Sequence, residues 1–176
     1  MNYANIISCD TANGEGIRTS LFVSGCTIHC PGCFNQEAQD FNYGQPYTAQ
    51  TKATILDHLS KPYIAGLSIL GGDPVCQDYN GLIDLISLAQ DVRNTGKTVW
   101  LWTGMTYGLI FPPARVTLTE LHYLRQCLFM ACNVVVDGPF IEAQKDLTLT
   151  FRGSTNQRII DVDKTLKANK IILYKE

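Results

Sequence analysis

The chain has 176 residues, of which 45% are hydrophobic, and a formal net charge of −2. This size predicts one domain over residues 1–176, with a core at about residues 1–160 and a short tail at residues 161–176. The weak acidity argues against nucleic-acid or membrane-surface binding, and the polar N-terminal segment and lack of a run of about 20 apolar residues predict a cytoplasmic protein that does not cross a membrane.

Short apolar segments alternate with amphipathic ones along the chain. Strands are predicted at residues 17–23, 66–70, 98–102, 133–136, 147–151 and 171–174, and helices at 48–59, 78–92 and 117–129. This alternation is typical of an α/β fold with a parallel sheet. A full eight-unit barrel needs about 250 residues at roughly 30 per strand–helix unit. The sequence therefore predicts an incomplete (β/α)6-type parallel barrel, open on one side.

A triplet of cysteines directly follows the first predicted strand. Cys26, Cys30 and Cys33 have the spacing C-x3-C-x2-C. Ordinary 4Fe-4S clusters take four cysteines, so three would leave one iron open to a small molecule, which indicates catalysis. The alternative is zinc, which typically takes four ligands. No second cysteine pair is present to complete such a site, and His29 is poorly spaced to do so.

The four other cysteines are scattered. In a reducing cytosol, clustered cysteines are more often metal ligands or catalytic groups than disulfides. Cys127 and Cys132 have apolar neighbours and are expected to pack in the core. Cys9 and Cys76 lie near functional stretches, and either could in principle supply a fourth cluster ligand.

Further polar and glycine-rich segments follow predicted strands. Gly71, Gly72 and Asp73 end the strand at 66–70, where consecutive glycines allow a ligand to approach the backbone and where carbonyls can bind an ammonium group. Thr103 follows the next strand, and Arg152, whose guanidinium suits a carboxylate, follows residues 147–151. Because active sites form where parallel strands end, these motifs are expected to converge. Arg18 is read as a solvated charge.

Two motifs together, the cysteine triplet and the glycine-rich turn at 71–74, resemble radical S-adenosylmethionine enzymes. Within that superfamily the chain resembles the activating proteins of anaerobic (class III) ribonucleotide reductases. The segments that carry the resemblance are residues 1–3, 13–16, 21–26, 30–35, 71–74, 100–104, 137–138 and 152–157. They cover nearly the whole chain to about residue 160. Two departures from the wider superfamily, Asp73 in place of a glutamate and Gly32 in place of an aromatic residue, are shared with the activating proteins.

The resemblance implies a mechanism and a set of partners. The three cysteines would hold a 4Fe-4S cluster whose fourth iron binds S-adenosylmethionine. An electron from a flavodoxin-like donor would cleave the C5′–S bond, and the resulting 5′-deoxyadenosyl radical would take a hydrogen atom from a glycine of the anaerobic reductase. The protein would position these groups, while the cofactors carry the bond chemistry, so no side chain is assigned as catalytic.

The resemblance also assigns the cofactor contacts. Gly71, Gly72 and Asp73 would hold the methionine amino group, and Thr103 would meet the ribose or the methionine end. Arg152 is a candidate for the methionyl carboxylate or for partner docking. Residues Gly32 and Phe34 flank the third cysteine and are the candidates for the adenine side.

Two other functions fit parts of the pattern. Another small radical enzyme, such as a pyruvate formate-lyase-type activase or a small-molecule enzyme, would usually be longer and have a substrate pocket of its own. An iron–sulfur electron carrier would need no glycine-rich turn and would usually complete its own fourth ligand.

Overall fold

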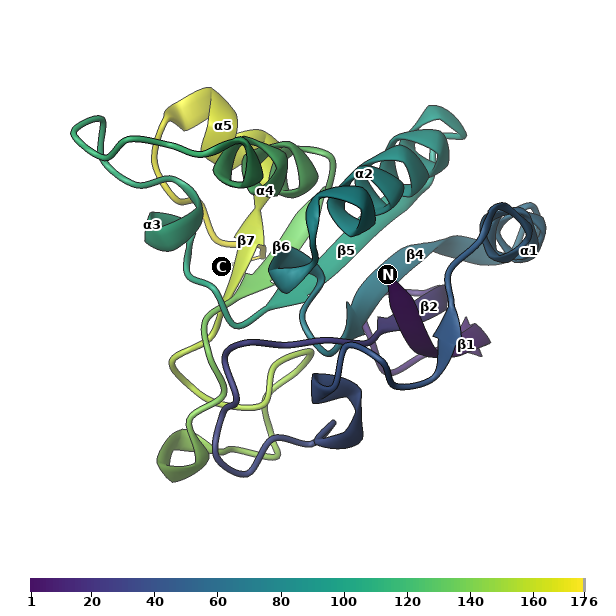
Figure 1. The fold of residues 1–176 in the computed structure, drawn as a ribbon, viewed down its shortest axis with the longest axis horizontal. Helices are drawn as coiled ribbons and strands as arrows, with labels where there is room; N and C mark the ends of the chain where they lie inside the picture. Colours follow the sequence, from purple (N-terminus) through teal and green to yellow (C-terminus); the bar gives the residue numbers. More distant parts are fainter. Residues whose placement is uncertain (176) are drawn as a thin grey trace.

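The computed structural model describes residues 1–175, which form one open seven-stranded sheet with helices along it (Figure 1). Across the sheet the strands are β3 (Gln45–Pro46), β1 (Asn2–Asp10), β2 (Ile17–Val23), β4 (Ile64–Gly71), β5 (Thr98–Thr103), β6 (Val134–Asp137) and β7 (Arg158–Asp161). The four neighbouring strands β2, β4, β5 and β6 are parallel, whereas β1 and β3 on one side and β7 on the other pair antiparallel. The α/β class is confirmed, but the expectation of parallel strands throughout is wrong.

The helices begin where side chains cap them. They are α1 (Ala49–Leu59), α2 (Tyr79–Asn94), the short α3 (Tyr107–Ile110), α4 (Glu120–Met130) and α5 (Val162–Ala168). The residues before α1, α2 and α4, namely Thr48, Asp78 and Thr119, each accept a hydrogen bond from a backbone N–H of the first turn. The three predicted helices are thus confirmed. Short 3-10 turns lie at η1 (Glu37–Gln39), η2 (Pro74–Cys76) and η3 (Glu142–Gln144).

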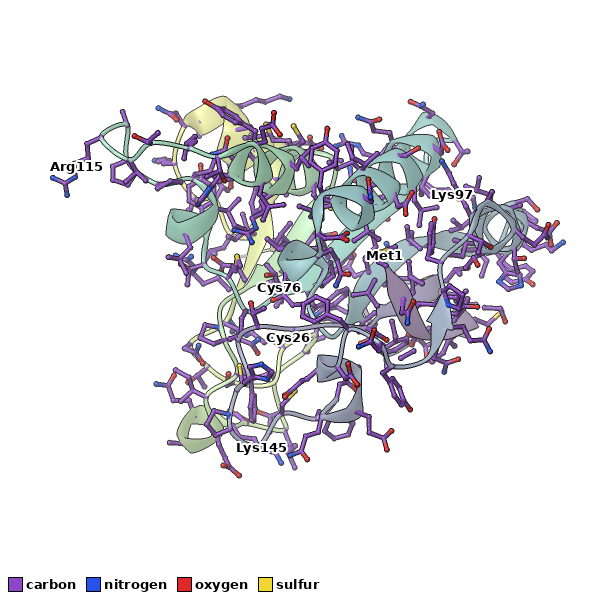
Figure 2. The ribbon with its side chains drawn as sticks, in the orientation of Figure 1. Met1, Cys26, Cys76, Lys97, Arg115 and Lys145 are labelled. Atoms are coloured by element: carbon purple, nitrogen blue, oxygen red, sulfur yellow. The ribbon has the colours of Figure 1, made fainter. Side chains whose placement is uncertain are left out.

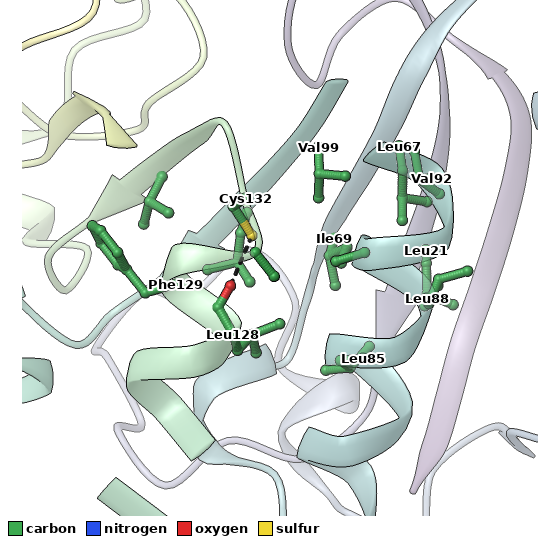
Figure 3. Close-up of a cluster of buried hydrophobic side chains, with 14 of the residues drawn as sticks. Leu21, Leu67, Ile69, Leu85, Leu88, Val92, Val99, Leu128, Phe129 and Cys132 are labelled. Carbon is green, nitrogen blue, oxygen red and sulfur yellow. Dashed lines mark hydrogen bonds between the residues drawn. The ribbon is translucent and has the colours of Figure 1, made fainter. Parts of the chain in front are cut away.

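The main core lies between the sheet and its helices. Strand residues that alternate along the parallel strands, such as Leu67, Ile69 and Val99, pack against α2 and α4 (Figure 3). Cys132 belongs to this core, as predicted, and its thiol donates to the carbonyl of Leu128 at 3.2 Å. Cys127 is exposed on α4, so its predicted place in the core is wrong.

The opposite face of the sheet carries polar and aromatic side chains. Arg18 is 1% exposed and donates to the hydroxyl of Ser68 and to the carbonyls of Leu67 and Thr98. Its reading as a solvated charge is therefore wrong. The ring of Trp100 lies beside the Arg18 guanidinium at 5.6 Å. The buried polar groups of this face are paired by strand and loop atoms; the Ser68 hydroxyl, for example, donates to the carbonyl of Asn13 at 2.5 Å.

The C-terminal part of the chain differs most from the prediction. Residues 147–151 form a loop, and Leu173 makes a single bridge to Ile160 in place of the strand expected at 171–174. Glu176, the last residue of the predicted tail, lies outside the described residues. Three elements of the structure, β1, β7 and α5, have no counterpart among the predicted ones. None of the helices within residues 1–175 combines the length and apolar character needed to span a bilayer.

Two long loops project together from the carboxyl ends of the parallel strands. Residues 24–44 follow β2, and residues 138–157 connect β6 to β7; both lie in the lower part of Figure 1. The loops lie side by side because residues of both line the same cavity. The sheet therefore positions the site by holding the two ends of each loop.

Candidate functional site

The cysteine triplet lies on a loop that is closed at its base by backbone hydrogen bonds. Gly25 N–H donates to the carbonyl of Ala38 at 2.8 Å, and Cys26 N–H donates to that of Gln39 at 3.0 Å. A tight turn at the far side is marked by a bond from Cys33 N–H to the carbonyl of Cys30 at 3.1 Å. These contacts fold the loop back on itself, and all three cysteines of the triplet line one cavity.

That space is a cavity of about 690 Å³ at the carboxyl ends of the parallel strands. Every site residue predicted from the sequence lines it: Cys26, Cys30, Cys33, Gly32, Phe34, Gly71, Gly72, Asp73, Thr103 and Arg152. These residues come from segments up to 126 positions apart (152 − 26) and meet because parallel strands end at one edge. Their convergence is a property of the structure, whereas their roles stay predictions.

The glycine-rich turn is required by packing against the cysteine loop. A Cβ atom on Gly72 would lie 2.5 Å from the carbonyl oxygen of Ala38 and 2.6 Å from that of Gly25. Asp73 N–H donates to this same Gly25 oxygen at 2.8 Å. Gly71 adopts a φ of +110°, which side chains disfavour. The glycines thus let the turn and the loop touch.

The carboxylate of Asp73 is bonded to neighbouring protein groups. It is 1% exposed and accepts hydrogen bonds from Val75 N–H at 2.8 Å, Gly104 N–H at 2.8 Å and the Thr103 hydroxyl at 3.0 Å. Burial raises the pKa of Asp73 to about 6, although the bonds from Gly104 and Val75 oppose that shift. The Thr103 hydroxyl therefore holds Asp73 in place, which differs from the ligand contact predicted for it.

The thiol of Cys26 has a second cysteine beside it. Ligand atoms of Cys26, Asp73 and Cys76 all lie within 4.8 Å of one another. Hydrogen bonding from Cys76 lowers the pKa of Cys26, whereas this contact and burial raise the pKa of Cys76. A lowered pKa favours the thiolate that a metal requires.

A single-ion site at this group does not fit the donor set. The Asp73 oxygens are already bonded to protein donors. The group also includes only one cysteine of the triplet, leaving Cys30 and Cys33 unused. Three thiols spread around one cavity fit a cluster of several irons better than one zinc ion.

Arg152 reaches the cavity from the long loop between β6 and β7. This loop folds back on itself through bonds from Thr155 N–H to the carbonyl of Gln144 at 3.0 Å and from Asp146 N–H to that of Gly153 at 3.3 Å. One Arg152 nitrogen donates to the carbonyl of Gln157 at 2.7 Å. Because residues 147–151 are not a strand, the expectation that Arg152 follows a strand end is wrong.

Several residues of the site carried no clear signal in the sequence. Gln77 is buried, and its side-chain amide donates to the carbonyls of Ser24 at 3.0 Å and Asp73 at 3.1 Å, which ties the cysteine loop to the glycine-rich turn. Asn35 donates to the carbonyl of Gly71 at 3.3 Å. It lies within the segment 30–35 that carried the resemblance, so its position could have been suspected, whereas nothing around Gln77 marked it.

Comparisons with known proteins give one family model and a set of relatives that share one name. Residues 12–160 match a family model described as a 4Fe-4S single cluster domain. The anaerobic ribonucleoside-triphosphate reductase-activating protein of Escherichia coli (strain K12) is 37% identical over 161 residues, which cover 89% of this chain and 96% of that protein. Proteins of the same name from Vibrio cholerae and from Enterobacteria phage T4 are 39% and 36% identical, each over 90% of this chain and over 97% and 93% of their own.

Proposed function

The chain belongs to the family of anaerobic ribonucleoside-triphosphate reductase-activating proteins, and on that premise we propose that it generates a radical on a glycine of such a reductase. The observation that carries the proposal is one cavity lined by both the cysteine triplet and the glycine-rich turn. An electron carrier would need the first feature without the second. The residues present therefore suit an enzyme that binds a small molecule beside its cluster.

The bound groups would supply the redox chemistry: an electron from a flavodoxin-like donor would allow a 4Fe-4S cluster to cleave S-adenosylmethionine reductively, and the resulting 5′-deoxyadenosyl radical would take a hydrogen atom from the reductase glycine. The protein's part is to hold and orient. Cys26, Cys30 and Cys33 would bind three irons as thiolates and leave the fourth free for the cofactor.

The glycine-rich turn would position the amino group of S-adenosylmethionine. Since the Asp73 carboxylate is held by Thr103 and Gly104, we assign the ammonium contact to the backbone carbonyls of Gly71 and Gly72. The buried negative charge of Asp73 would attract the ammonium group without a direct hydrogen bond to it. Thr103 would act indirectly, by holding the Asp73 carboxylate in place.

Three further cavity residues would bind the carboxylate and the adenine of S-adenosylmethionine. The free nitrogens of Arg152 suit the methionyl carboxylate or an acidic group of the partner. Gly32 and Phe34 line the cavity and would face the adenine, and the side chain of Phe34 is 98% exposed. An exposed aromatic ring can stack on a base without rearrangement of the core.

The same proposal extends to the fold type, the extent of the domain and the cellular location. The four parallel strands, with antiparallel strands on both sides, form an open sheet, and we propose that the parallel part corresponds to an incomplete (β/α)6-type barrel. Residues 1–176 act as one domain. Thiolate ligands and a reduced donor need a reducing compartment, so the cytoplasm is the proposed location.

Anaerobic reconstitution followed by electron paramagnetic resonance tests the function. We expect about four irons per chain, slow S-adenosylmethionine cleavage by the reduced protein, and a glycyl radical only when the anaerobic reductase is added. The variant Cys30→Ala should lose the cluster signal, whereas Cys127→Ala, which removes an exposed thiol on α4, should keep it. Cofactor cleavage with no radical on the reductase would point to a different radical enzyme. Bound zinc in place of iron would overturn the proposal.

A further inference from the structure

Cys76 is a buried thiol that the proposed function does not use. It ends the short turn η2, and its sulfur lies within 4.8 Å of that of Cys26 on the loop after β2. Figure 2 shows the two residues on neighbouring segments at the top of the cysteine loop. Cys26 is 9% exposed and Cys76 is 7% exposed. Two thiols from distant parts of the sequence therefore lie side by side, partly shielded from solvent.

The backbone around this pair is fixed from both sides. Asp73 N–H donates to the carbonyl of Gly25 at 2.8 Å, and the Gln77 amide donates to the carbonyls of Ser24 and Gly25 at 3.0 and 3.3 Å. Cys26 and Cys76 each adjoin a residue in these bonds. A disulfide needs a sulfur separation of about 2.05 Å. The two sulfurs therefore have to close from within 4.8 Å to this distance, between segments whose backbones are already hydrogen-bonded to each other.

We propose that Cys26 and Cys76 form a reversible disulfide in the cluster-free protein, and that this bond prevents cluster assembly until it is reduced. The disulfide itself rests only on the geometry of the pair. Its effect on cluster assembly rests on the proposed function, in which Cys26 is a ligand of the cluster. One bond would then both protect Cys26 from further oxidation and keep the site empty of iron.

A peroxide is the oxidant that the geometry admits. Cys26 lines the cavity, so a molecule little larger than water can reach its sulfur. Attack of that sulfur on hydrogen peroxide gives a sulfenic acid and releases water. The Cys76 sulfur then displaces the hydroxyl group, which leaves as a second water with the thiol proton. The two thiols lose two electrons in total, and the peroxide gains them. A dithiol reverses the reaction by exchange.

Mass spectrometry of the cluster-free chain tests the pairing directly. Protein stripped with a chelator under anaerobic conditions is treated with one equivalent of hydrogen peroxide, alkylated and digested. We expect a cross-linked peptide pair that contains Cys26 and Cys76, lighter by two hydrogen atoms than the separate peptides. Dithiothreitol should remove it. A cross-link confined to Cys26, Cys30 and Cys33, or irreversible oxidation of Cys26 without a cross-link, would overturn the inference.

Iron uptake after the same treatment tests the consequence. The peroxide-treated wild type should lose most of its iron uptake and recover it after dithiothreitol, whereas Cys76→Ser should recover less of it, because without the partner thiol Cys26 is open to further, irreversible oxidation. Cys127→Ser is the matched control, since it removes an exposed thiol on α4 and should behave like the wild type. If Cys76→Ser and Cys76→Ala both fail to assemble a cluster without any oxidation, Cys76 is a ligand and the inference is wrong.

The two proposals fail in different ways. If the fully reduced wild type takes up no iron, the proposed function fails, while the cross-link map still decides whether the disulfide forms. If iron uptake is normal and no cross-link with Cys76 is found, only the disulfide is rejected.

Discussion

Asp10 is a buried residue at the end of β1, and neighbouring hydrogen-bond donors stabilise its ionised carboxylate. It accepts hydrogen bonds from Asn13 Nδ2 at 2.7 Å, Ala12 N–H at 2.8 Å and the hydroxyl of Ser20. Burial alone would raise the pKa of Asp10, but these bonds outweigh burial and hold the pKa below its usual value. The ionised form is therefore the one that stabilises the turn between β1 and β2.

The substitution Asp10→Asn should destabilise the protein in a pH-dependent way. Since the folded-state pKa is depressed, the ionised carboxylate stabilises the fold above the unfolded value of 3.8, and this contribution is lost as the pH falls through the lower folded pKa. We expect a loss of about 1–3 kcal/mol at neutral pH that shrinks under acidic conditions, measured by urea unfolding across the pH range. Asp57→Asn, at an exposed site on α1, should show little effect at either pH. A loss for Asp10→Asn that is the same at all pH values would contradict this account.

At the scale of elements, Arg18 connects three neighbouring strands. It lies on β2 and donates to Ser68 Oγ at 2.7 Å and to the carbonyl of Leu67 at 2.7 Å, both on β4. It also donates to the Thr98 carbonyl of β5 at 2.9 Å. A guanidinium can serve several acceptors in different directions, which no apolar side chain of similar size can do.

Replacement of Arg18 by Met should weaken the sheet although it adds hydrophobic volume. The buried hydroxyl and carbonyls would lose their donor, so we expect the free energy of unfolding to fall by about 2–4 kcal/mol. Arg115→Met is the matched control, because Arg115 lies exposed on the loop before α4 (Figure 2) and should change stability by less than about 0.5 kcal/mol. Equal stability of the two variants, measured by chemical denaturation, would show that the Arg18 bonds contribute nothing net.

Elements with a strong apolar period could be predicted, and those set by long-range contacts could not. The strand at residues 17–23 and the capped helices follow from local pattern and capping residues. Residues 147–151 also alternate, but Leu147 and Leu149 line the cavity in a loop without strand partners. β1 was missed because many of its side chains are exposed, so no clear alternation marks it. Arg18 looked solvated because its acceptors lie about 50 and 80 positions away.

For the molecule as a whole, filling the cavity should raise thermal stability. A ligand that binds only the folded chain stabilises it by about 2.7 kcal/mol at 100 times its Kd, which for a chain of this size corresponds to roughly 5–10 °C in Tm. We expect anaerobic reconstitution with iron and sulfide to produce a rise of this order, and removal of the cluster by a chelator to reverse it, as measured by differential scanning fluorimetry.

The matched control for this experiment is Cys33→Ser, which removes one proposed cluster ligand and is expected to leave the loop folded. Cys33→Ser should have nearly the same Tm as the cluster-free wild type but should gain little on reconstitution, because a serine hydroxyl is a poor ligand for iron–sulfur clusters. A similar gain in Cys33→Ser and in the wild type would mean that the stabilisation comes from iron bound elsewhere.

The position of the site was predictable for a reason of topology. Parallel strands end at one edge, so the triplet, the glycine-rich turn and Thr103 were expected together. Arg152 arrives there by a loop that folds back, which no local pattern indicates. The contact of Thr103 with Asp73, the bonds of Gln77 and the proximity of Cys76 to Cys26 all depend on how two loops pack. Such contacts become visible only in three dimensions.

The two tryptophans of the chain lie two positions apart on β5, with ring centroids 5.8 Å apart. Trp100 is buried beside Arg18, while Trp102 borders the cavity and donates from its indole nitrogen to the carbonyl of Phe151 at 2.8 Å. The fluorescence of Trp102 can therefore report on what occupies the cavity. Intrinsic fluorescence, with no added dye, would register arrivals and departures at the cavity through the indole of Trp102, and the emission of the Trp100 ring stacked on it would change with it.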